Sequence, residues 1–175
     1  LALSRAEARR SLGVADAARL VVNLGTVCER KGQHVYLRAG DLLASAGRLE
    51  GTVLAAVGAR RTFYDRALED LATGARIPGL RIVPETDQPL LWLRAADLFV
   101  CSSYEESFPR VVMEAAALGV PIVATRVHGV PDIVRPDIDA LLVPPGDPLA
   151  LAGAMDRALS HPEESAQRAA SASLR

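Results

Sequence analysis

The sequence predicts an α/β fold, a Rossmann-like, doubly wound parallel sheet of about six strands. Short apolar runs alternate with amphipathic segments of helical length along the 175 residues. Most of these runs are apolar at every position, which is typical of strands whose two faces are both covered by helices. Half of the residues are hydrophobic, enough for a chain of this length to bury a single core. In such folds, ligands bind at the carboxyl ends of the strands.

The first half of the chain is expected to contain three strands, each followed by a helix. The expected strands are the apolar runs 20–24, 53–57 and 80–83. The expected helices are 32–46 with Val35, Leu42 and Leu43 on its apolar side, a segment through Phe63, Ala67, Leu68 and Leu71, and a segment carrying Leu90, Leu91 and Leu93. This alternation favours parallel strands, because each helix carries the chain back to the same edge of the sheet.

The second half is expected to add three strands and three helices. The strands are 98–101, 122–125 and 140–143. A helix should begin near Pro109, because the N–H that proline lacks has no partner at a first helical position. Asp147 and Pro148 form an N-cap and first-turn pair for the next helix. That helix carries Leu151, Met155 and Leu159. Residues 162–175 are expected to form a terminal, charged, alanine-rich helix.

Composition excludes several classes of function. A net charge of −1 and a total of one Trp, three Tyr and three Phe leave neither a basic face nor the stacking platforms that nucleic-acid-binding proteins use. Two cysteines are too few for a disulfide framework. The sequence has no signal peptide and no apolar run of about 18 residues. We therefore expect a cytoplasmic protein that does not bind nucleic acid.

Two carboxylates mark the most informative stretch of the chain. Glu106 follows the strand 98–101 in a turn, and Glu114 lies about a turn and a half into the next helix. A lone glutamate is usually a solvated surface residue. The neighbours of Glu114 on this helix are almost all apolar, however, and an unpaired charge is costly in such surroundings. Glu114 is therefore expected to have a partner or a ligand.

The start of this helix is expected to attract an anion. The N–H groups of Ser107, Phe108 and Arg110 have no partner within the helix, so they can donate to a phosphate. The carboxylates nearby can accept hydrogen bonds from hydroxyl groups. A ligand with phosphate between two sets of hydroxyls fits this arrangement, and a nucleotide sugar is such a ligand.

A second chemical site lies at the first strand–helix junction. Gly25 allows the chain to leave its strand, and Lys31 with Gly32 stands where a lysine could reach a diphosphate held over the helix start. A cation there would neutralise the charge that develops as a nucleotide leaves. The alternative interpretation is that Glu29, Arg30 and Lys31 are a solvated run in a loop.

The order of residues from Glu106 to Thr125 resembles the signature of a known family. The matching residues are Glu106, Glu114, Ala115, Gly119, Pro121, Val123, Ala124 and Thr125. They follow the pattern Glu, seven residues, Glu-Ala, and then Gly-x-Pro-x-Val-Ala-Thr. The family is that of the retaining nucleotide-sugar glycosyltransferases of family-four type, which have the two-domain GT-B fold. The likeness continues in the segments 24–34, 95–109, 128–134 and 141–151, so it covers nearly the whole chain.

The resemblance implies a domain assignment and an activity. Residues 1–175 would be the C-terminal nucleotide-sugar-binding domain. The N-terminal acceptor domain would be absent from this chain, which begins with Leu and shows the likeness almost from its start. The whole enzyme would transfer a hexose from a UDP-, GDP- or ADP-sugar to a glycan or glycolipid acceptor. The chain alone would bind the donor without turnover, and membrane association would come through the missing domain.

The resemblance also assigns roles to residues. Glu106 would accept hydrogen bonds from the donor sugar, and Glu114 from the ribose. Backbone N–H groups at the helix start and the Lys31 cation would hold the diphosphate, while the loop 83–86 would contact the base. The residues expected to bind the donor are Gly25, Thr26, Arg30, Lys31, Val83, Pro84, Glu106, Ser107, Phe108, Arg110, Val111 and Glu114. Glu106 and Lys31 are also the residues expected to take part in catalysis.

Two positions depart from the family pattern. In the family, an arginine directly follows the junction glycine and clamps the two phosphates together with the lysine. Thr26 stands at that position in this chain, and Arg30 is a possible substitute for the missing arginine. Pro109 stands where many relatives have glycine, so the helix start offers one N–H fewer.

No metal and no cofactor are expected at this site. Asp137 and Asp139 have the spacing of an Asp-x-Asp metal motif, but two carboxylates in a turn before a strand are more often turn formers. The three histidines have no metal-ligand spacing. His34 is expected to be structural and His161 to lie in a turn between helices. His128 either lines the sugar pocket or belongs only to its loop.

Two other functions fit the same fold. One is a non-catalytic nucleotide-binding or subunit-interaction module. The other is half of a sugar-nucleotide epimerase, which shares the two-domain architecture but needs further acid–base carboxylates and histidines around the sugar. The match at 128–134 and 141–151 favours the transferase.

Overall fold

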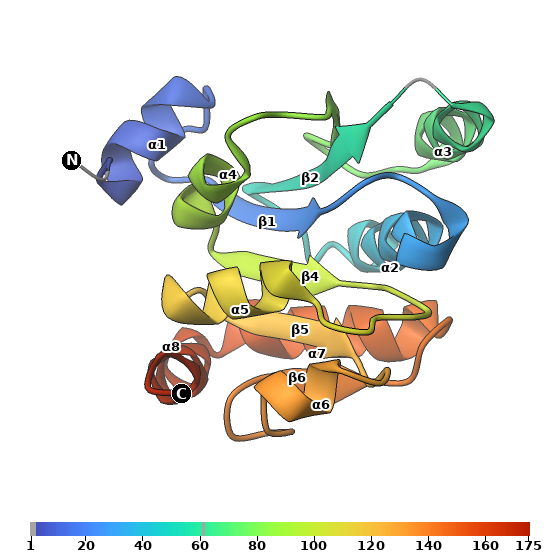
Figure 1. Cartoon of the computed structure of the whole chain (residues 1–175). Coiled ribbons are helices and arrows are strands. Elements are labelled where there is room, and N and C mark those ends of the chain that lie inside the picture. Colours follow the sequence, from blue (N-terminus) through green and yellow to red (C-terminus); the bar gives the residue numbers. More distant parts are fainter. Residues whose placement is uncertain (1–2, 61) are drawn as a thin grey trace.

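The computed structural model describes residues 3–60 and 62–175, which form one six-stranded sheet with helices on both faces (Figure 1). All neighbouring strands are parallel, in the order β3-β2-β1-β4-β5-β6. The predicted Rossmann-like, doubly wound fold is confirmed.

Each strand begins and ends within two residues of its predicted apolar run. The strands are β1 (Arg19–Leu24), β2 (Thr52–Ala59), β3 (Arg81–Pro84), β4 (Leu98–Cys101), β5 (Ile122–Thr125) and β6 (Leu141–Val143). The helices are α1 (Arg5–Ser11), α2 (Gln33–Ser45), α3 (Phe63–Gly74), α4 (Pro89–Ala95), α5 (Arg110–Ala117), α6 (Val130–Ile133), α7 (Pro148–Ser160) and α8 (Pro162–Ser173). A 3-10 turn, η1 (Glu29–Lys31), precedes α2.

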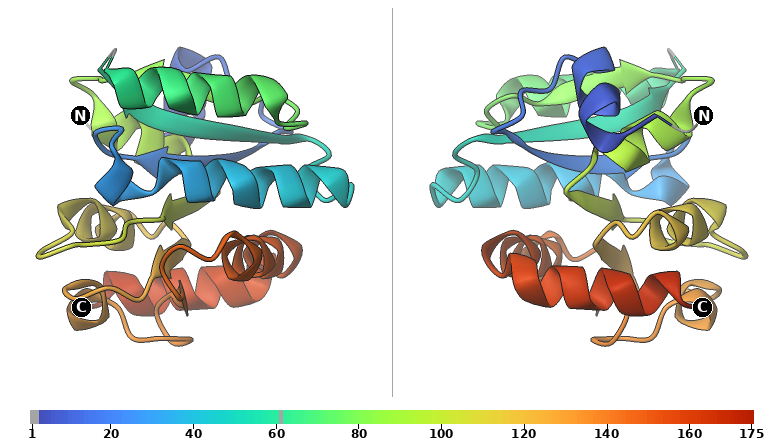
Figure 2. Two further views of the ribbon diagram at one scale, coloured as in Figure 1. Left: turned by 90° about the vertical axis from the view of Figure 1, so that its right-hand side faces the viewer. Right: turned by 90° about the vertical axis from the view of Figure 1, so that its left-hand side faces the viewer.

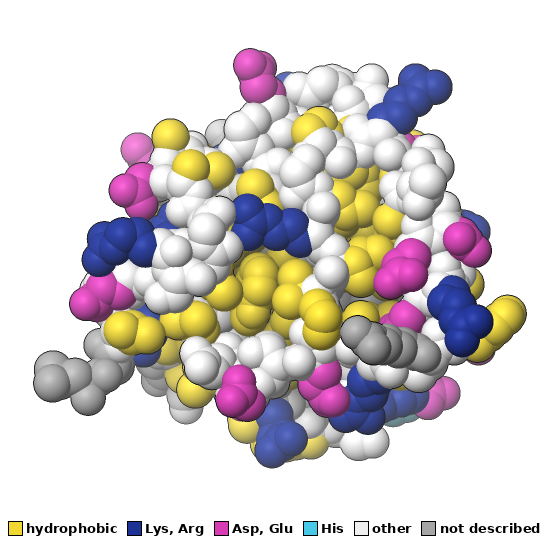
Figure 3. All heavy atoms as spheres, turned by 90° about the horizontal axis from the view of Figure 1, so that it is seen from above, with side chains coloured by type: hydrophobic (Ala, Val, Ile, Leu, Met, Phe, Trp, Pro, Cys, Tyr) yellow, Lys and Arg dark blue, Asp and Glu magenta, His cyan; other side chains and the backbone are white. Residues whose placement is uncertain are grey.

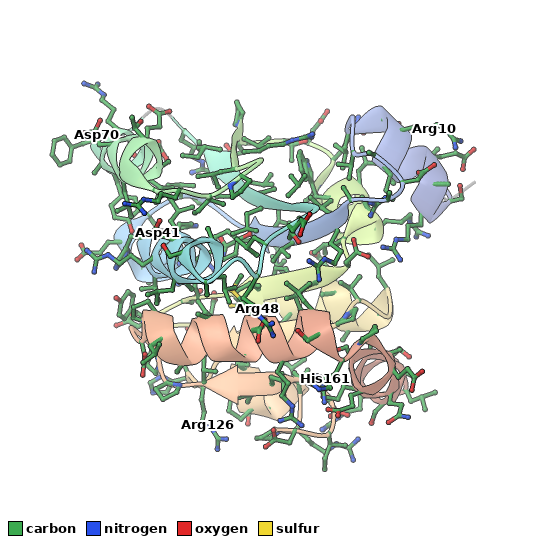
Figure 4. The ribbon with its side chains drawn as sticks, turned by 180° about the vertical axis from the view of Figure 1, so that it is seen from behind. Arg10, Asp41, Arg48, Asp70, Arg126 and His161 are labelled. Carbon is green, nitrogen blue, oxygen red and sulfur yellow. The ribbon has the colours of Figure 1, made fainter. Side chains whose placement is uncertain are left out.

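The helices form one layer on each face of the sheet (Figure 2). Hydrophobic side chains of α1, α4, α5 and α6 pack against one face, and those of α2, α3 and α7 pack against the other, which Figure 4 shows from behind. Successive residues of β1 point to opposite layers, because Leu20 and Val22 pack in the first cluster and Val21 in the second. Helix α8 packs against α5 and α7.

Helix α1, helix α6 and the turn η1 do not appear among the predicted elements. Helix α1 begins after Ser4, whose hydroxyl accepts from the Glu7 N–H while the Glu7 carboxylate accepts from the Ser4 N–H. This reciprocal pair is a capping box, so the Ser-x-x-Glu spacing is a sequence signal for the helix. Arg9 anchors α1 by donating to Asp97 and to the carbonyl oxygen of Ala95. Helix α6 has only four residues, too few to show a helical period.

The β3 edge is the least covered part of the sheet. Figure 3 shows the molecule from above, where hydrophobic side chains gather among charged ones. Arg81, Ile82 and Val83 are each half-buried, and the Arg81 guanidinium donates to the carbonyl oxygens of Leu12 and Gly13. This contact ties the edge strand to the loop after α1.

A charged contact on the surface links the loop after α2 to α7. Arg48, which is labelled in Figure 4 and follows α2, pairs with Asp156 of α7 at 2.8 Å. His161 ends α7 and begins α8, as predicted for a turn between helices. Within the described part of the chain, no helix has both the length and the apolar character needed to cross a membrane.

The strand order reverses between β1 and β4. Strand β2 follows β1 on one side, whereas β4, which comes after β3 in the chain, lies on the other side of β1. The loops that leave these two neighbouring strands therefore diverge at their carboxyl ends. Doubly wound sheets bind their ligands at this position.

Candidate functional site

A cavity of about 160 Å³ lies where the strand order reverses. We call it the β1–β4 cavity. It is formed by the carboxyl ends of β1 and β4, the turn η1 and the start of α5. Its lining residues are Asn23, Leu24, Lys31, Gln33, Phe99, Cys101, Ser102, Ser103, Glu106, Phe108, Pro109, Arg110, Val111 and Val112. Ligand pockets for drug-sized molecules enclose roughly 300–1,000 Å³, so this cavity can hold only part of a nucleotide sugar.

Lys31 and Glu106 meet in the β1–β4 cavity. The Lys31 Nζ lies 2.5 Å from Oε1 of Glu106, and the two side chains are only 21% and 7% exposed. The residues are 75 positions apart in the sequence. Gly32 makes this approach possible, because a Cβ at this position would lie 2.2 Å from the carbonyl oxygen of Ser102. The glycine also takes a left-handed conformation with φ of 64°.

Two buried hydroxyl groups hold Glu106 in place through hydrogen bonds. The Ser103 hydroxyl donates to the same Oε1 atom at 2.6 Å, and the Thr125 hydroxyl donates to the carbonyl oxygen of Ser103 at 2.6 Å. Ser103 and Thr125 are both buried. Among residues 3–60 and 62–175, nothing donates to the second carboxylate oxygen, Oε2 of Glu106.

A second polar chain supports the backbone of Lys31. The Asn23 side-chain amide donates to the Ser102 hydroxyl at 3.0 Å, and that hydroxyl donates to the carbonyl oxygen of Lys31 at 3.0 Å. Asn23, Ser102 and Ser103 were not among the predicted site residues. A sequence signal exists for Asn23, because a polar residue inside the apolar run of β1 must find a partner when it is buried.

The start of α5 offers free backbone donors, as predicted, but not the predicted set. The N–H groups of Ser107, Phe108 and Val111 donate to no acceptor in the described chain. The Arg110 N–H, which was expected to be free, donates to the carbonyl oxygen of Phe108 at 2.9 Å. Pro109 caps the helix without a side-chain hydrogen bond. The helix start therefore presents three backbone donors, and Arg110 is one of the residues that line the cavity.

The loop between β5 and α6 contacts the turn that carries Glu106, before α5. The Gly129 N–H donates to the carbonyl oxygen of Glu106 at 3.1 Å. A Cβ at Gly129 would lie 2.3 Å from the carbonyl oxygen of Ser107. His128, next to it, is exposed and does not line the β1–β4 cavity.

Glu114 is half-buried on α5 and does not line the β1–β4 cavity. Its carboxylate makes no hydrogen bond or ion pair with any described residue. The predicted protein partner is therefore not found, which leaves the predicted ligand role open.

The loop after β1 holds several predicted residues outside the cavity wall. Gly25 and Thr26 follow β1 but do not line the β1–β4 cavity. The buried Gln33 side chain, which was not predicted, fixes this loop by donating to the carbonyl oxygen of Thr26 at 3.2 Å and accepting from the Cys28 N–H at 3.3 Å. Arg30 lies on a different cavity, and its guanidinium donates to the carbonyl oxygen of Glu105 at 3.0 Å. The structure therefore does not bring Arg30 to the side of Lys31.

Two aromatic rings, His34 and Tyr104, line the cavity beside Arg30. The His34 ring stacks on Tyr104 with ring centroids 5.7 Å apart, and its Nδ1 lies 2.6 Å from the Tyr64 hydroxyl. Burial, with a smaller effect of the nearby Arg38, lowers the pKa of His34. These contacts agree with the structural role predicted for His34.

The remaining predicted residues lie further away. Val83 and Pro84 end β3, which is separated from β1 by β2, so they share the carboxyl edge of the sheet but not the β1–β4 cavity. Asp139 is fully buried and pairs with Arg135 at 2.8 Å, and Asp137 adopts a left-handed turn conformation. Both are turn residues, as predicted. The described residues contain no group of three or more potential metal-ligating side chains.

The fold and the site together define a class of protein. A six-stranded Rossmann-like sheet with this strand order, and with a polar cavity at its switch point, corresponds to one half of the GT-B fold. Comparison with known proteins gives the family. The family model described as "Glycosyl transferases group 1" matches residues 18–161. The chain belongs to this family.

The relatives that match the chain are glycosyltransferases. The D-inositol 3-phosphate glycosyltransferase of Thermomonospora curvata is 36% identical over 174 residues, which are 95% of this chain and 40% of that protein. The chain thus spans about two fifths of the length of the curated relatives it matches.

Solved structures match over nearly the whole chain. Anabaena HepE in complex with UDP is 25% identical, with a TM-score of 0.84 over 97% of this chain and 46% of that chain. The C-terminal domain of the group 1 glycosyl transferase LpcC from Francisella tularensis has a TM-score of 0.79 over 98% of this chain and 90% of that chain. At 19% identity, the second likeness concerns the fold alone.

Proposed function

We propose that this chain binds the nucleoside-diphosphate sugar donor of a retaining hexosyltransferase, with the diphosphate and the sugar meeting at the β1–β4 cavity. One observation carries the proposal: a half-buried lysine and a buried glutamate form an ion pair beside three free backbone donors at the start of α5. The UDP-bound HepE structure supports a nucleotide ligand, since HepE is similar in both sequence and fold.

Each group has a chemical task in this proposal. Lys31 and the N–H groups of Ser107, Phe108 and Val111 hold the diphosphate and stabilise the charge that develops as the sugar leaves. The free Oε2 of Glu106 accepts a hydrogen bond from a sugar hydroxyl. Glu114, which has no partner in the described chain, accepts from the ribose. The loop that begins at Val83 contacts the base.

The proposal extends to the whole protein. Transfer takes place between this domain and a second domain that carries the glycan or glycolipid acceptor, so this chain alone binds the donor without turnover. The names of the curated relatives support a sugar-transfer reaction. No metal is needed in this proposal, because the Lys31 ammonium group and hydrogen bonds from the backbone N–H groups offset the negative charge of the diphosphate.

Titration calorimetry tests the donor site. UDP, GDP and ADP are titrated into the chain in EDTA, and we expect one of them to bind. Lys31→Ala should weaken that binding at least tenfold, in line with the roughly 1.5–3 kcal/mol of a charged hydrogen bond. Binding that appears only after magnesium is added would refute the metal-free part. No binding in either condition would refute the donor site.

A further inference from the structure

The two carboxylate oxygens of Glu106 have different surroundings. Oε1 accepts two short hydrogen bonds, from Lys31 Nζ at 2.5 Å and from the Ser103 hydroxyl at 2.6 Å. Oε2 accepts none from the described residues, and Glu106 lines the β1–β4 cavity. The carboxylate is therefore held through Oε1, while Oε2 remains available to a ligand.

Ser103 can fix the carboxylate because it is itself fixed. It follows β4 and is buried, and its carbonyl oxygen accepts from the Thr125 hydroxyl at 2.6 Å. Thr125 is the last residue of β5, whose neighbour in the sheet is β4. The pairing of the two strands thus fixes the buried serine next to Glu106, at the edge of the sheet where the loops diverge.

Lys31 alone could not hold the carboxylate in this orientation. An ammonium group has three donors on a flexible stem and no preferred plane, so it can bridge both oxygens of a carboxylate. A carboxylate bridged in this way would offer its second oxygen to the lysine rather than to a ligand. The Ser103 hydroxyl removes this freedom, since it occupies Oε1 from a direction set by the backbone.

We propose that Ser103, anchored by Thr125, is a positioning residue that keeps Oε2 of Glu106 directed into the β1–β4 cavity. It would thereby set how strongly the chain prefers a nucleotide sugar over the corresponding nucleoside diphosphate. The inference rests on the proposed function, because it concerns the sugar subsite of the same cavity. It assigns no chemistry to Ser103, which acts through Glu106.

The discriminating measurement is a ratio of two affinities. Kd values are measured by calorimetry for the diphosphate that binds among UDP, GDP and ADP, and for its glucose ester, UDP-glucose, GDP-glucose or ADP-glucose. For Ser103→Ala, we expect the affinity for the glucose ester to fall roughly tenfold and that for the diphosphate to change less than about twofold. Thr125→Val should shift this ratio of affinities in the same direction. Thr125→Ser keeps the hydroxyl, so its ratio should equal that of the wild type.

A matched control separates positioning from loss of a buried hydroxyl. Ser165 is also buried and donates to the carbonyl oxygen of Ala158 at 2.9 Å, and it does not line the β1–β4 cavity. Ser165→Ala should leave the affinity ratio unchanged. Equal losses for both ligands in Ser103→Ala, or an unchanged ratio, would overturn the positioning role.

Thermal unfolding tests the contact without any ligand. Ser103→Ala should lower Tm by about 2–4 °C in the wild-type chain and by clearly less in a Glu106→Ala background, because the two residues are in contact. If no diphosphate binds, the proposed function fails. The double-mutant cycle of unfolding temperatures still tests the contact between Ser103 and Glu106. Additive Tm shifts would then show that Ser103 does not hold Glu106.

Discussion

Lys31 and Arg110 are the basic side chains that line the β1–β4 cavity, and only Lys31 pairs with Glu106. Thr26 follows β1 by two residues and lies just outside the cavity lining. Arg30, next to Lys31 in the sequence, is turned to a different cavity. Substitutions at Thr26, Arg30 and Lys31 therefore separate the effect of a cation in the β1–β4 cavity from the effect of a cation near it.

Substitutions at Thr26 and Lys31 should have opposite effects on diphosphate binding. Thr26→Arg adds a planar donor group beside the proposed diphosphate, and we expect affinity to rise by a factor of a few to about tenfold. Lys31→Ala removes the central cation and should weaken binding. Calorimetry at two salt concentrations measures both, and the arginine variant should lose affinity more steeply as salt is raised.

Arg30→Ala is the matched control for these two variants. Its guanidinium donates to the carbonyl oxygen of Glu105, away from the β1–β4 cavity, so diphosphate affinity should change little. Binding of the free nucleoside should respond to none of the three changes. Weaker diphosphate binding in a folded Thr26→Arg variant would mean that the diphosphate does not lie near Thr26.

At the scale of elements, the site depends on the close approach of two loops. The loop after β5 reaches the turn before α5, where the Gly129 N–H donates to the Glu106 carbonyl oxygen. The free donors of Ser107 and Phe108 lie in the same turn. Any change that separates the two loops moves these donors together with Glu106.

Gly129→Ala should disturb both stability and binding. Its Cβ would lie 2.3 Å from the Ser107 carbonyl oxygen, which is backbone and cannot turn away, so the two loops must separate. We expect the free energy of unfolding to fall by about 1–3 kcal/mol, as in other overpacked sites, and diphosphate affinity to fall as well. Urea unfolding and calorimetry on the same variant measure the two effects.

Gly153→Ala provides the comparison for this experiment. Gly153 lies within α7, and a Cβ there would meet nothing within 4 Å. Alanine is favoured over glycine inside a helix by about 1 kcal/mol, so this variant should be slightly more stable than the wild type and bind equally well. A Gly129→Ala variant that matches it would show that the loops are not in close contact.

At the scale of the whole molecule, α8 is attached through a buried carboxylate. Asp139 accepts from Arg135 and from the Ser171 hydroxyl of α8 at 2.7 Å, and it lies 3.5 Å from Arg175. The hydrogen bonds from Arg135 hold the pKa of Asp139 well below its ordinary value, although burial opposes this effect. The charge of Asp139 is therefore a stabilising feature of the folded chain.

The pH dependence of stability should reveal this contribution. A carboxyl whose pKa is lowered on folding stabilises the protein above its unfolded pKa, about 3.9, and loses that effect as the pH falls toward its folded value. We expect Asp139→Asn to be about 2–3 kcal/mol less stable than the wild type at pH 7, with the difference shrinking below about pH 4. Urea unfolding from pH 7 to pH 3 measures this.

The exposed Asp137 is the control for this prediction. It lies in the same turn, and its weak pair with Arg157 spans 3.9 Å. Asn tolerates the left-handed conformation that Asp137 adopts, so Asp137→Asn should change stability little at any pH. A constant difference between Asp139→Asn and the wild type across this range would show that the charge of Asp139 does not stabilise the fold.

The elements of the sheet follow from local properties of the sequence. Six apolar runs, separated by segments of helical pattern, were sufficient to predict six parallel strands and their boundaries within two residues. Helix α6 was not predicted, because a single turn is too short to show a helical period. Helix α1 was not predicted either, although its capping box is present in the sequence. Lys31 and Glu106 were predicted to serve one ligand, through a resemblance and through the rule for carboxyl ends.

The supporting contacts of the site depend on how distant segments pack. Thr125, Ser103 and Glu106 form one chain of hydrogen bonds only because β5 lies beside β4 in the sheet. Arg30 turned away from Lys31 because η1 points successive side chains in different directions, which residue order alone does not reveal. Local patterns specify elements because period and capping act within a few residues. Directions of side chains across the sheet depend on strand order and close packing, which arise only when the whole chain has folded.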